Sequence, residues 1–379
     1  MKAIQLAGLA FAGLASAAHA GGIDRSGQPV DLIFEEGNYV ELGFARTWPS
    51  VSGDDIAQAP GAPFFGYDSG QGYDDVARDF DLLRFGVKYD VTDKVSVFVI
   101  GGEDYGVDVK YDRATGSLLG GTYAWANSYT LTMGGRYHLN DNVSVHAGLR
   151  REWAEGAIGL GGLAYSSSNG YEVDLSDNVA WGWMAGAAYE RKEIALRVAL
   201  TYFSEIEHDF ETEETLNGAS LGTSAKTDVK TPRSVNLDFQ TGVAPDWLVF
   251  GQVHWVDHSQ FTVEPERFTA LTGRTLVSLD DSTTYTLGVG HRFTDSLSGS
   301  LAYIYDNVDG DDLVSPLAPT HGSQALRLGA KYTIGAVDIQ GGLRYTWLGD
   351  AKAQTADTAR ADFSDNEAVS LGIKVGYRF

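Results

Sequence analysis

The chain ends in Val369-Ser-Leu-Gly-Ile-Lys-Val-Gly-Tyr-Arg-Phe379, where apolar and polar residues alternate without a break. Successive side chains of a β-strand point to opposite faces, so this segment has one apolar and one polar face. A transmembrane β-strand needs about 9–11 residues to cross the hydrocarbon core of a bilayer. The segment is therefore predicted to span a membrane as a strand, with its apolar face toward lipid and its polar face toward water.

The amino-terminus has the features of an export signal. Lys2 precedes an apolar run that ends near Ala18, and the small-residue pattern Ala18-His19-Ala20 follows. Such a pattern marks the cleavage site of a secretory signal peptide. We predict that residues 1–20 are removed during export through the periplasm and that the mature protein begins at Gly21. A membrane anchor would need a longer apolar run and a stop-transfer flank.

Composition narrows the class of protein further. The chain has no cysteine, which excludes disulfides and thiolate metal sites. Its formal net charge of −23 argues against nucleic acid as a partner. The chain is 43% hydrophobic, yet only the signal is apolar enough to suggest a membrane helix. A mature protein of this sequence that spans a membrane must therefore cross it with strands.

Tight turns alternate with longer polar stretches along the chain. Residues 89–97, 137–145 and 291–298 share one pattern, in which two or three turn residues join two alternating segments. A soluble β-sandwich could also alternate, but it would not need tight turns on one side only. Short turns at one end and long loops at the other are typical of transmembrane barrels.

We therefore predict an all-β protein, a transmembrane antiparallel β-barrel of about 14 strands formed by residues 37–379. The expected strands lie near residues 37–48, 80–91, 95–104, 123–139, 143–156, 179–191, 194–206, 232–243, 247–260, 283–293, 297–306, 323–334, 337–348 and 367–379. Their outward faces are apolar, and their inward faces carry both basic and acidic residues. Any inward arginine could bind a substrate carboxylate, but a barrel interior also needs such charges to pair with one another.

Three short motifs in the middle of the chain resemble one protein family. They are Thr231-Pro-Arg-Ser-Val-Asn-Leu-Asp-Phe239, Pro245-Asp-Trp247 and Trp255-Val-Asp-His-Ser-Gln-Phe261. Residues 94–106 and the last three predicted strands are also similar. The family is FadL/TodX, whose outer-membrane transporters carry long-chain fatty acids and other hydrophobic compounds on a fourteen-stranded barrel. The aromatic Phe379 resembles the signal by which the barrel assembly machinery recognises outer-membrane proteins.

The resemblance implies a luminal plug and a lateral exit. In the family an amino-terminal hatch fills the lumen, but here only residues 21–36 precede the first strand and the family's Asn-Pro-Ala signature is absent. The shortened hatch would use Ile23, Val30, Leu32, Ile33 and Phe34, while a periplasmic tail is the alternative. Family substrates leave sideways where the third strand kinks.

The kink of the family's third strand corresponds here to Gly101-Gly102. Glycines within a strand suggest a bulge or a bend, and a packing role is the alternative. Apolar residues lie where the family has its substrate-capturing loops, and they either form a binding groove or pack the loops together. These candidate binding residues are Ile158, Leu160, Leu163, Phe210, Leu216 and Leu221.

No pattern in the chain indicates catalysis. A Gly-x-Ser-x-Gly nucleophile motif is absent, and the acidic stretch 306–312 does not have the spacing of a calcium loop. We expect no catalytic residue, metal or cofactor. The predicted protein is a monomeric passive transporter in the bacterial outer membrane, in contact with outer-membrane lipid and taking hydrophobic small molecules such as fatty acids. A general diffusion porin for small polar solutes is the alternative.

Overall fold

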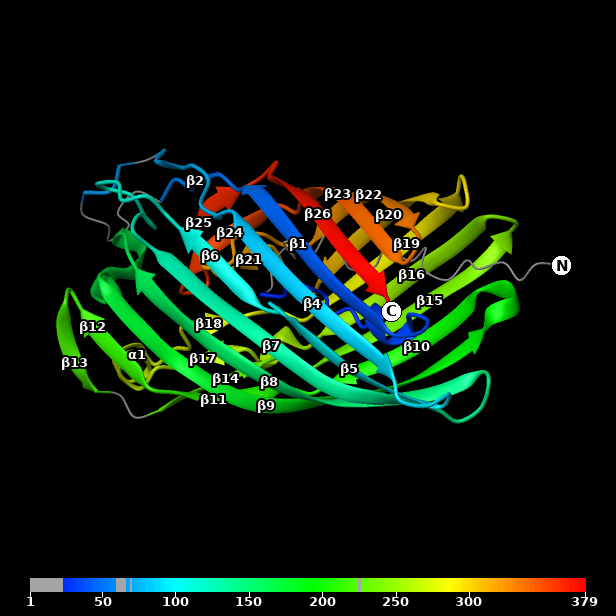
Figure 1. Ribbon diagram of the computed structural model, residues 1–379. Helices are drawn as coiled ribbons and strands as arrows, with labels where there is room; N and C mark the ends of the chain where they lie inside the picture. The colour runs from blue at the N-terminus through cyan, green and yellow to red at the C-terminus, as the bar shows by residue number, and fades with distance from the viewer. Residues whose placement is uncertain (1–22, 59–65, 69, 224–225) are drawn as a thin grey trace.

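A computed structural model describes residues 23–58, 66–68, 70–223 and 226–379, so the predicted signal peptide lies outside the described residues. Within these ranges, antiparallel strands close into a 14-strand barrel (Figure 1), which confirms the predicted fold. Nearly every wall strand pairs with its neighbours along the chain. The first strand pairs with both the second and the last, and this closes the sheet.

The wall strands match the predicted segments closely. In chain order they are β1 (Tyr39–Ser50), β4 (Phe80–Asp90), β5 (Val95–Gly102) with β6 (Gly106–Lys110), β7 (Tyr123–His138), β8 (Val143–Leu160), β9 (Tyr171–Arg191), β10 (Leu196–Phe203), β15 (Ser234–Ala244), β16 (Trp247–Val256), β19 (Ser282–Arg292), β20 (Leu297–Val308), β22 (Ser323–Ile334), β23 (Val337–Leu348) and β26 (Glu367–Arg378). The third wall strand, expected to run through 95–104, is instead divided into β5 and β6. Strands β8 and β9 extend further into the loops than predicted.

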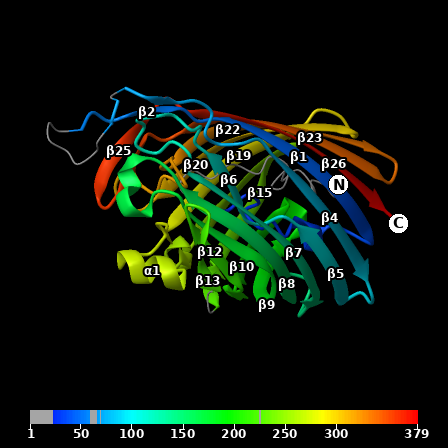
Figure 2. The same ribbon diagram turned by 90° about the vertical axis from the view of Figure 1, so that its left-hand side faces the viewer.

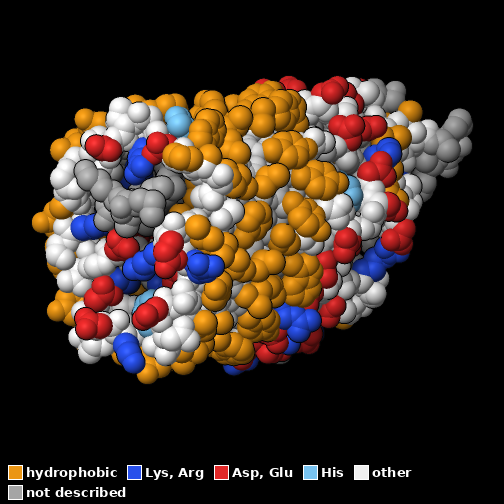
Figure 3. Space-filling view, turned by 90° about the vertical axis from the view of Figure 1, so that its right-hand side faces the viewer, with side chains coloured by type: hydrophobic (Ala, Val, Ile, Leu, Met, Phe, Trp, Pro, Cys, Tyr) orange, Lys and Arg blue, Asp and Glu red, His pale blue; other side chains and the backbone are white. Residues whose placement is uncertain are grey.

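The alternation at the end of the chain is realised in β26. Leu371 and Ile373 are 54% and 51% exposed on the outside of the barrel, whereas Ser370 and Lys374 are buried on the inside. Other strands repeat this pattern. Figure 3 shows hydrophobic side chains gathered in a broad band, with charged side chains on either side of it. The band is the surface that a bilayer would cover.

Tight turns lie at one end of the barrel and long loops at the other (Figures 1 and 2). Part of the loop region is a five-stranded sheet with its own hydrophobic core. Its strands are β2 (Gly53–Asp55), β3 (Gly72–Tyr73), β21 (Leu313–Val314), β24 (Ala351–Thr355) and β25 (Thr358–Phe363).

Further short elements complete the loops and turns. They are β11 (Ile206–Phe210), β12 (Thr212–Leu216), β13 (Ala219–Thr223), β14 (Thr227–Thr231), β17 (Thr262–Val263), β18 (Val277–Ser278), α1 (Glu266–Thr272), η2 (Leu163–Ser168), η3 (Lys192–Ile194) and η4 (His258–Gln260). No helix in the described part of the chain has the length and hydropathy needed to cross a membrane.

The start of the described chain, residues 23–36, lies inside the barrel, and we call it the luminal segment. It ends in the short helix η1 (Asp31–Phe34). Val30, Leu32 and Ile33 are buried against apolar residues that face inward from three wall strands. These inward residues are Phe98, Ile100, Met184 and Phe203. The luminal segment therefore occupies the lumen toward the short-turn end.

Candidate functional site

The third wall strand contains one residue more than its neighbour β7. β5 ends opposite Thr130 and β6 begins opposite Asn127. Three residues, Glu103–Tyr105, thus face only two, Ser128 and Tyr129. An extra residue of this kind is a β-bulge, which bends a strand and disturbs its ladder.

The bulge ends pairing with the strand on the other side. Arg84 opposite Gly102 is the last pair between β4 and the third strand, and Phe80–Leu83 pair only with β1. Nearer the loops, Ala77 meets Val109 in an isolated bridge. Between these points, no ladder joins the described residues of β4 to those of the third strand. We call this interruption of the wall the side window.

The luminal segment lines the inner side of the window. The Arg25 amide donates to the Asp104 carbonyl at 2.8 Å, and the Gly106 amide donates to the Ile23 carbonyl at 2.8 Å. The luminal segment thus pairs with the third strand where β4 does not. The buried guanidinium of Arg25 lies over the Phe80 ring, 4.5 Å from its centre, and so fills the window from inside.

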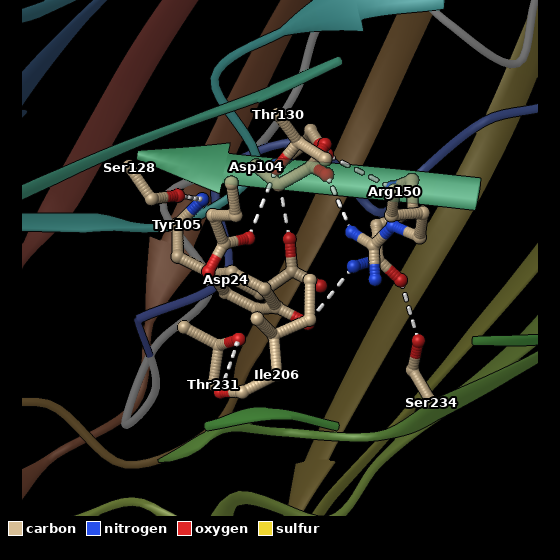
Figure 4. Close-up of polar contacts among 12 residues, drawn as sticks. Asp24, Asp104, Tyr105, Ser128, Thr130, Arg150, Ile206, Thr231 and Ser234 are labelled. Atoms are coloured by element: carbon tan, nitrogen blue, oxygen red, sulfur yellow. Dashed lines mark hydrogen bonds and ion pairs between the residues drawn. The ribbon is translucent and has the colours of Figure 1, made fainter. Parts of the chain in front are cut away.

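A buried polar network holds the bulge in place (Figure 4). The Arg150 guanidinium donates to Asp104 Oδ2 at 2.8 Å, and the Ser26 hydroxyl donates to Asp104 Oδ1 at 2.8 Å. The Tyr105 hydroxyl accepts from Gln28 Nε2 at 2.9 Å and donates to the Pro232 carbonyl at 3.1 Å. Both inward side chains of the bulge are therefore satisfied by groups from distant parts of the chain.

The opposite wall also binds the luminal segment. His254 Nε2 lies 2.7 Å from Asp24 Oδ2, and both side chains are buried. Asn236 donates through Nδ2 to the Gly27 carbonyl at 3.1 Å. Because β15 and β16 contribute these groups, the luminal segment is fixed to both sides of the barrel.

Above the luminal segment, toward the loops, lies an apolar hollow of about 820 Å³ including its mouth. Its walls come from β6 to β9, and strands and loops from later in the chain complete it. Most of its surface is aliphatic or aromatic. The lining includes Ile23, Tyr105, Val107, Ile158, Leu175, Phe210, Val229, Phe261, Val263, Val277, Leu279 and Leu317.

Two of the six candidate binding residues, Ile158 and Phe210, line this apolar hollow. Leu160, Leu216 and Leu221 belong to the hydrophobic cluster around it. Leu163 packs instead against the core of the five-stranded loop sheet. Among the lining residues that sequence analysis did not name as binding candidates, Tyr105, Gly106, Thr231 and Phe261 lay in segments that resembled the family. The role of all six as binding residues stays a prediction.

The glycine pair precedes the bulge and is fully paired. Gly101 lies opposite Phe85 and Leu131, and Gly102 is the last residue of β5. A Cβ on Gly101 would lie 2.4 Å from the Phe85 ring, so this glycine makes room for an aromatic side chain. The bend itself begins at Glu103. Whether the pair contributes to a lateral gate stays a prediction.

A second hollow, of about 640 Å³, adjoins the apolar hollow and reaches residues at the side window. The two share Gly106, Val107, Leu317 and Ala318 in their linings. Arg25 and Phe80 also line the second hollow, as do residues of β1 and the β20–β22 loop. A continuous set of lining residues therefore leads from the loops to the window.

The lumen toward the short-turn end is charged. Many inward charges form ion pairs, including Lys374 with Glu41 at 3.1 Å and Lys331 with Asp338 at 3.1 Å. Across the lumen from these pairs, Arg136 of β7 pairs with Glu190 of β9. This polar region contrasts with the apolar hollow above the luminal segment.

Comparisons with known proteins agree with this architecture. A family model described as outer membrane protein transport protein (OMPP1/FadL/TodX) matches residues 4–379. Among solved structures, a Pseudomonas aeruginosa FadL homologue is similar with a TM-score of 0.72 and 16% identity, over 93% of this chain and 92% of that one. The Pseudomonas putida toluene transporter TodX is similar with a TM-score of 0.62 and 13% identity, over 96% of each chain.

The Ralstonia pickettii toluene transporter TbuX is similar with a TM-score of 0.59 and 14% identity, over 96% of this chain and 97% of that one. No curated protein sequence matches the chain. At these identities the solved structures support the fold, whereas the family model covers nearly the whole sequence. The chain belongs to the family of outer-membrane transport proteins that includes FadL and TodX.

Proposed function

We propose that the protein passively moves hydrophobic molecules from the cell exterior to the side window and releases them laterally into the outer membrane. The observation that carries this proposal is the extra residue of the third strand. It ends pairing with β4 immediately beside the apolar hollow. The path would begin at the loops, pass through both hollows and leave between Phe80–Leu83 and the bulge.

The energetics favour a lateral exit over an axial one. Burial of each methylene group contributes about 0.8 kcal/mol, so the apolar hollow can hold a molecule that water disfavours. Farther along the axis the molecule would meet the luminal segment and then a lumen rich in ion pairs. Through the side window it would reach hydrocarbon, which solvates it equally well.

Two substrate classes are candidates. Long-chain fatty acids are implied by the sequence resemblance, and two structural relatives are described as toluene transporters. The apolar lining suits the hydrophobic part of either class. The alternative, a general diffusion porin, would require an open aqueous path along the axis, where the luminal segment lies.

Deletion of Asp104 tests the window. Without this residue Glu103 and Tyr105 can pair with Tyr129 and Ser128, which restores regular alternation and lets the strand continue along β4. The deletion should be made together with Arg150→Met so that no buried charge is left alone. The matched control combines Asp104→Asn with Arg150→Met, which removes the same charges and keeps the residue count.

The deletion variant should fold, as seen by heat-modifiable migration in gels, but cells that depend on it should take up radiolabelled hydrophobic substrate at least tenfold more slowly than cells with the control. Equal uptake by the two variants, both folded, would contradict lateral release. A large open-channel conductance of the purified wild-type protein would favour the porin instead.

A further inference from the structure

We infer that the path selects uncharged molecules, so that neutral hydrocarbons, esters and protonated acids pass while carboxylate anions are excluded. This inference rests on the proposed function and specifies its substrate class. Fatty acids, in this view, enter only in their protonated form.

The lining of the apolar hollow contains no lysine or arginine among the described residues. Its acidic and imidazole side chains are Glu155, which is exposed, and His208, which is buried. Transfer of an ionised carboxylate to such a surface is unfavourable unless a cation or several donors compensate for its lost hydration. The hydrophobic chain of a fatty acid would fit here, but its charged head would find no counterion.

The principal polar groups of the hollow are already engaged. His208 Nε2 lies 3.0 Å from Glu152 Oε1, and His208 Nδ1 lies 3.0 Å from Asn178 Oδ1. The Tyr105 hydroxyl donates to a backbone carbonyl, as does the hydroxyl of Thr231. The donors that remain, from groups such as Asn127, are neutral. They can bind an ester or a carboxylic acid, but they do not balance a full negative charge.

Charges near the hollow do not provide a net positive site. The buried Glu152 contacts His208 on the side away from the hollow. Arg150, which does not line the hollow, already pairs with Asp104. The lining of the second hollow includes two arginines, Arg25 and Arg78, and two aspartates, Asp24 and Asp108. An anion that passed the first hollow would therefore meet as many acidic as basic side chains at the exit.

Binding of a matched pair of probes tests the inference. Radiolabelled decanoic acid and its methyl ester share a chain, but only the acid ionises. The purified full-length protein in detergent should bind the ester equally at pH 5 and pH 9. It should bind the acid at least tenfold more weakly at pH 9, where the probe is an anion. The ester reports any effect of pH on the protein itself.

A charge introduced into the hollow provides the reciprocal test. Phe261→Lys places an ammonium group in the roof of the hollow, and Phe261→Gln is the neutral control. The lysine variant should bind decanoate at pH 9 at least fivefold more tightly than the glutamine variant, with equal binding of the ester. Equal binding of acid and ester by wild type at pH 9 would overturn the charge selection and leave the proposed function intact. Failure of wild type to bind either probe would instead count against the proposed function.

Discussion

Asp104 and Tyr105 are consecutive residues of the third wall strand, and both side chains point into the barrel. In a regular strand two neighbours face opposite sides of the sheet. Here Asp104 meets Arg150 of β8, and Tyr105 meets the luminal segment through Gln28. The bulge is thus fixed by polar partners, and the side window depends on both of these contacts.

Replacement of Arg150 by methionine should strongly destabilise the protein. The guanidinium is 1% exposed, and its loss leaves the Asp104 carboxylate buried without its ion-pair partner. Breaking a buried pair in this way costs about 3–5 kcal/mol. Denaturant unfolding in lipid vesicles, followed by tryptophan fluorescence, measures the loss. Addition of Asp104→Asn should restore part of the stability, and a purely additive double variant would rule out direct coupling.

Removal of residues 24–35 should open the barrel along its axis. Their apolar side chains pack in the lumen, and their backbone pairs with the third strand. Planar bilayer recordings of the deletion variant should give a much larger single-channel conductance than wild type. Val30→Ala, which shortens one packed side chain, is the control and should conduct like wild type. An unchanged conductance after the deletion would show that other groups block the lumen.

The change Phe379→Asp should impair assembly and leave export intact. Phe379 is exposed at the end of the chain, its amide donates to the Asn38 carbonyl at 3.1 Å, and its ring stacks on Tyr377. An acidic residue there removes the aromatic end that resembles the assembly signal. Gel fractionation should show less heat-modifiable protein and more unfolded protein in the periplasm. Wild-type levels of folded protein would refute this role.

The mature protein should begin at Gly21. Ala18-His19-Ala20 follows an apolar run, and signal peptides are cleaved after small residues in this pattern, so the cut is expected after Ala20. Intact-mass measurement of protein purified from outer membranes checks the position directly. A mass that includes residues 1–20 would contradict it.

The barrel could be predicted because alternation is a local property of the sequence. From Val369 to Phe379 the polarity of each residue indicates which face of the sheet it occupies. β26 follows that pattern to its last paired residue. The side window could not be located in this way. It depends on three residues facing two across a ladder, and this count requires the register of β7 against both halves of the third strand. The glycines at 101 and 102 lie in the same strand, but the extra residue falls after them, within Glu103–Tyr105.

The apolar hollow was predictable only in part. Ile158 lies in an apolar stretch and Phe210 in an acidic one, both beside predicted strands, and the structure brings both to the hollow. Val277 and Leu279 come from the β16–β19 loop and Leu317 from the β20–β22 loop, and these loops meet only in the folded barrel. Nothing in the local sequence distinguishes these three from apolar residues that simply pack a loop.

The extra residue of the third strand also has a genetic consequence. The window depends on how many residues separate β5 from β6, so single-base changes that alter the identity of Glu103, Asp104 or Tyr105 keep the number that creates it. Loss of one codon in this interval would remove the extra residue, and the window with it, in a single step. A lineage could therefore exchange a side-opening barrel for a continuous wall, or recover it, through an in-frame change of three nucleotides.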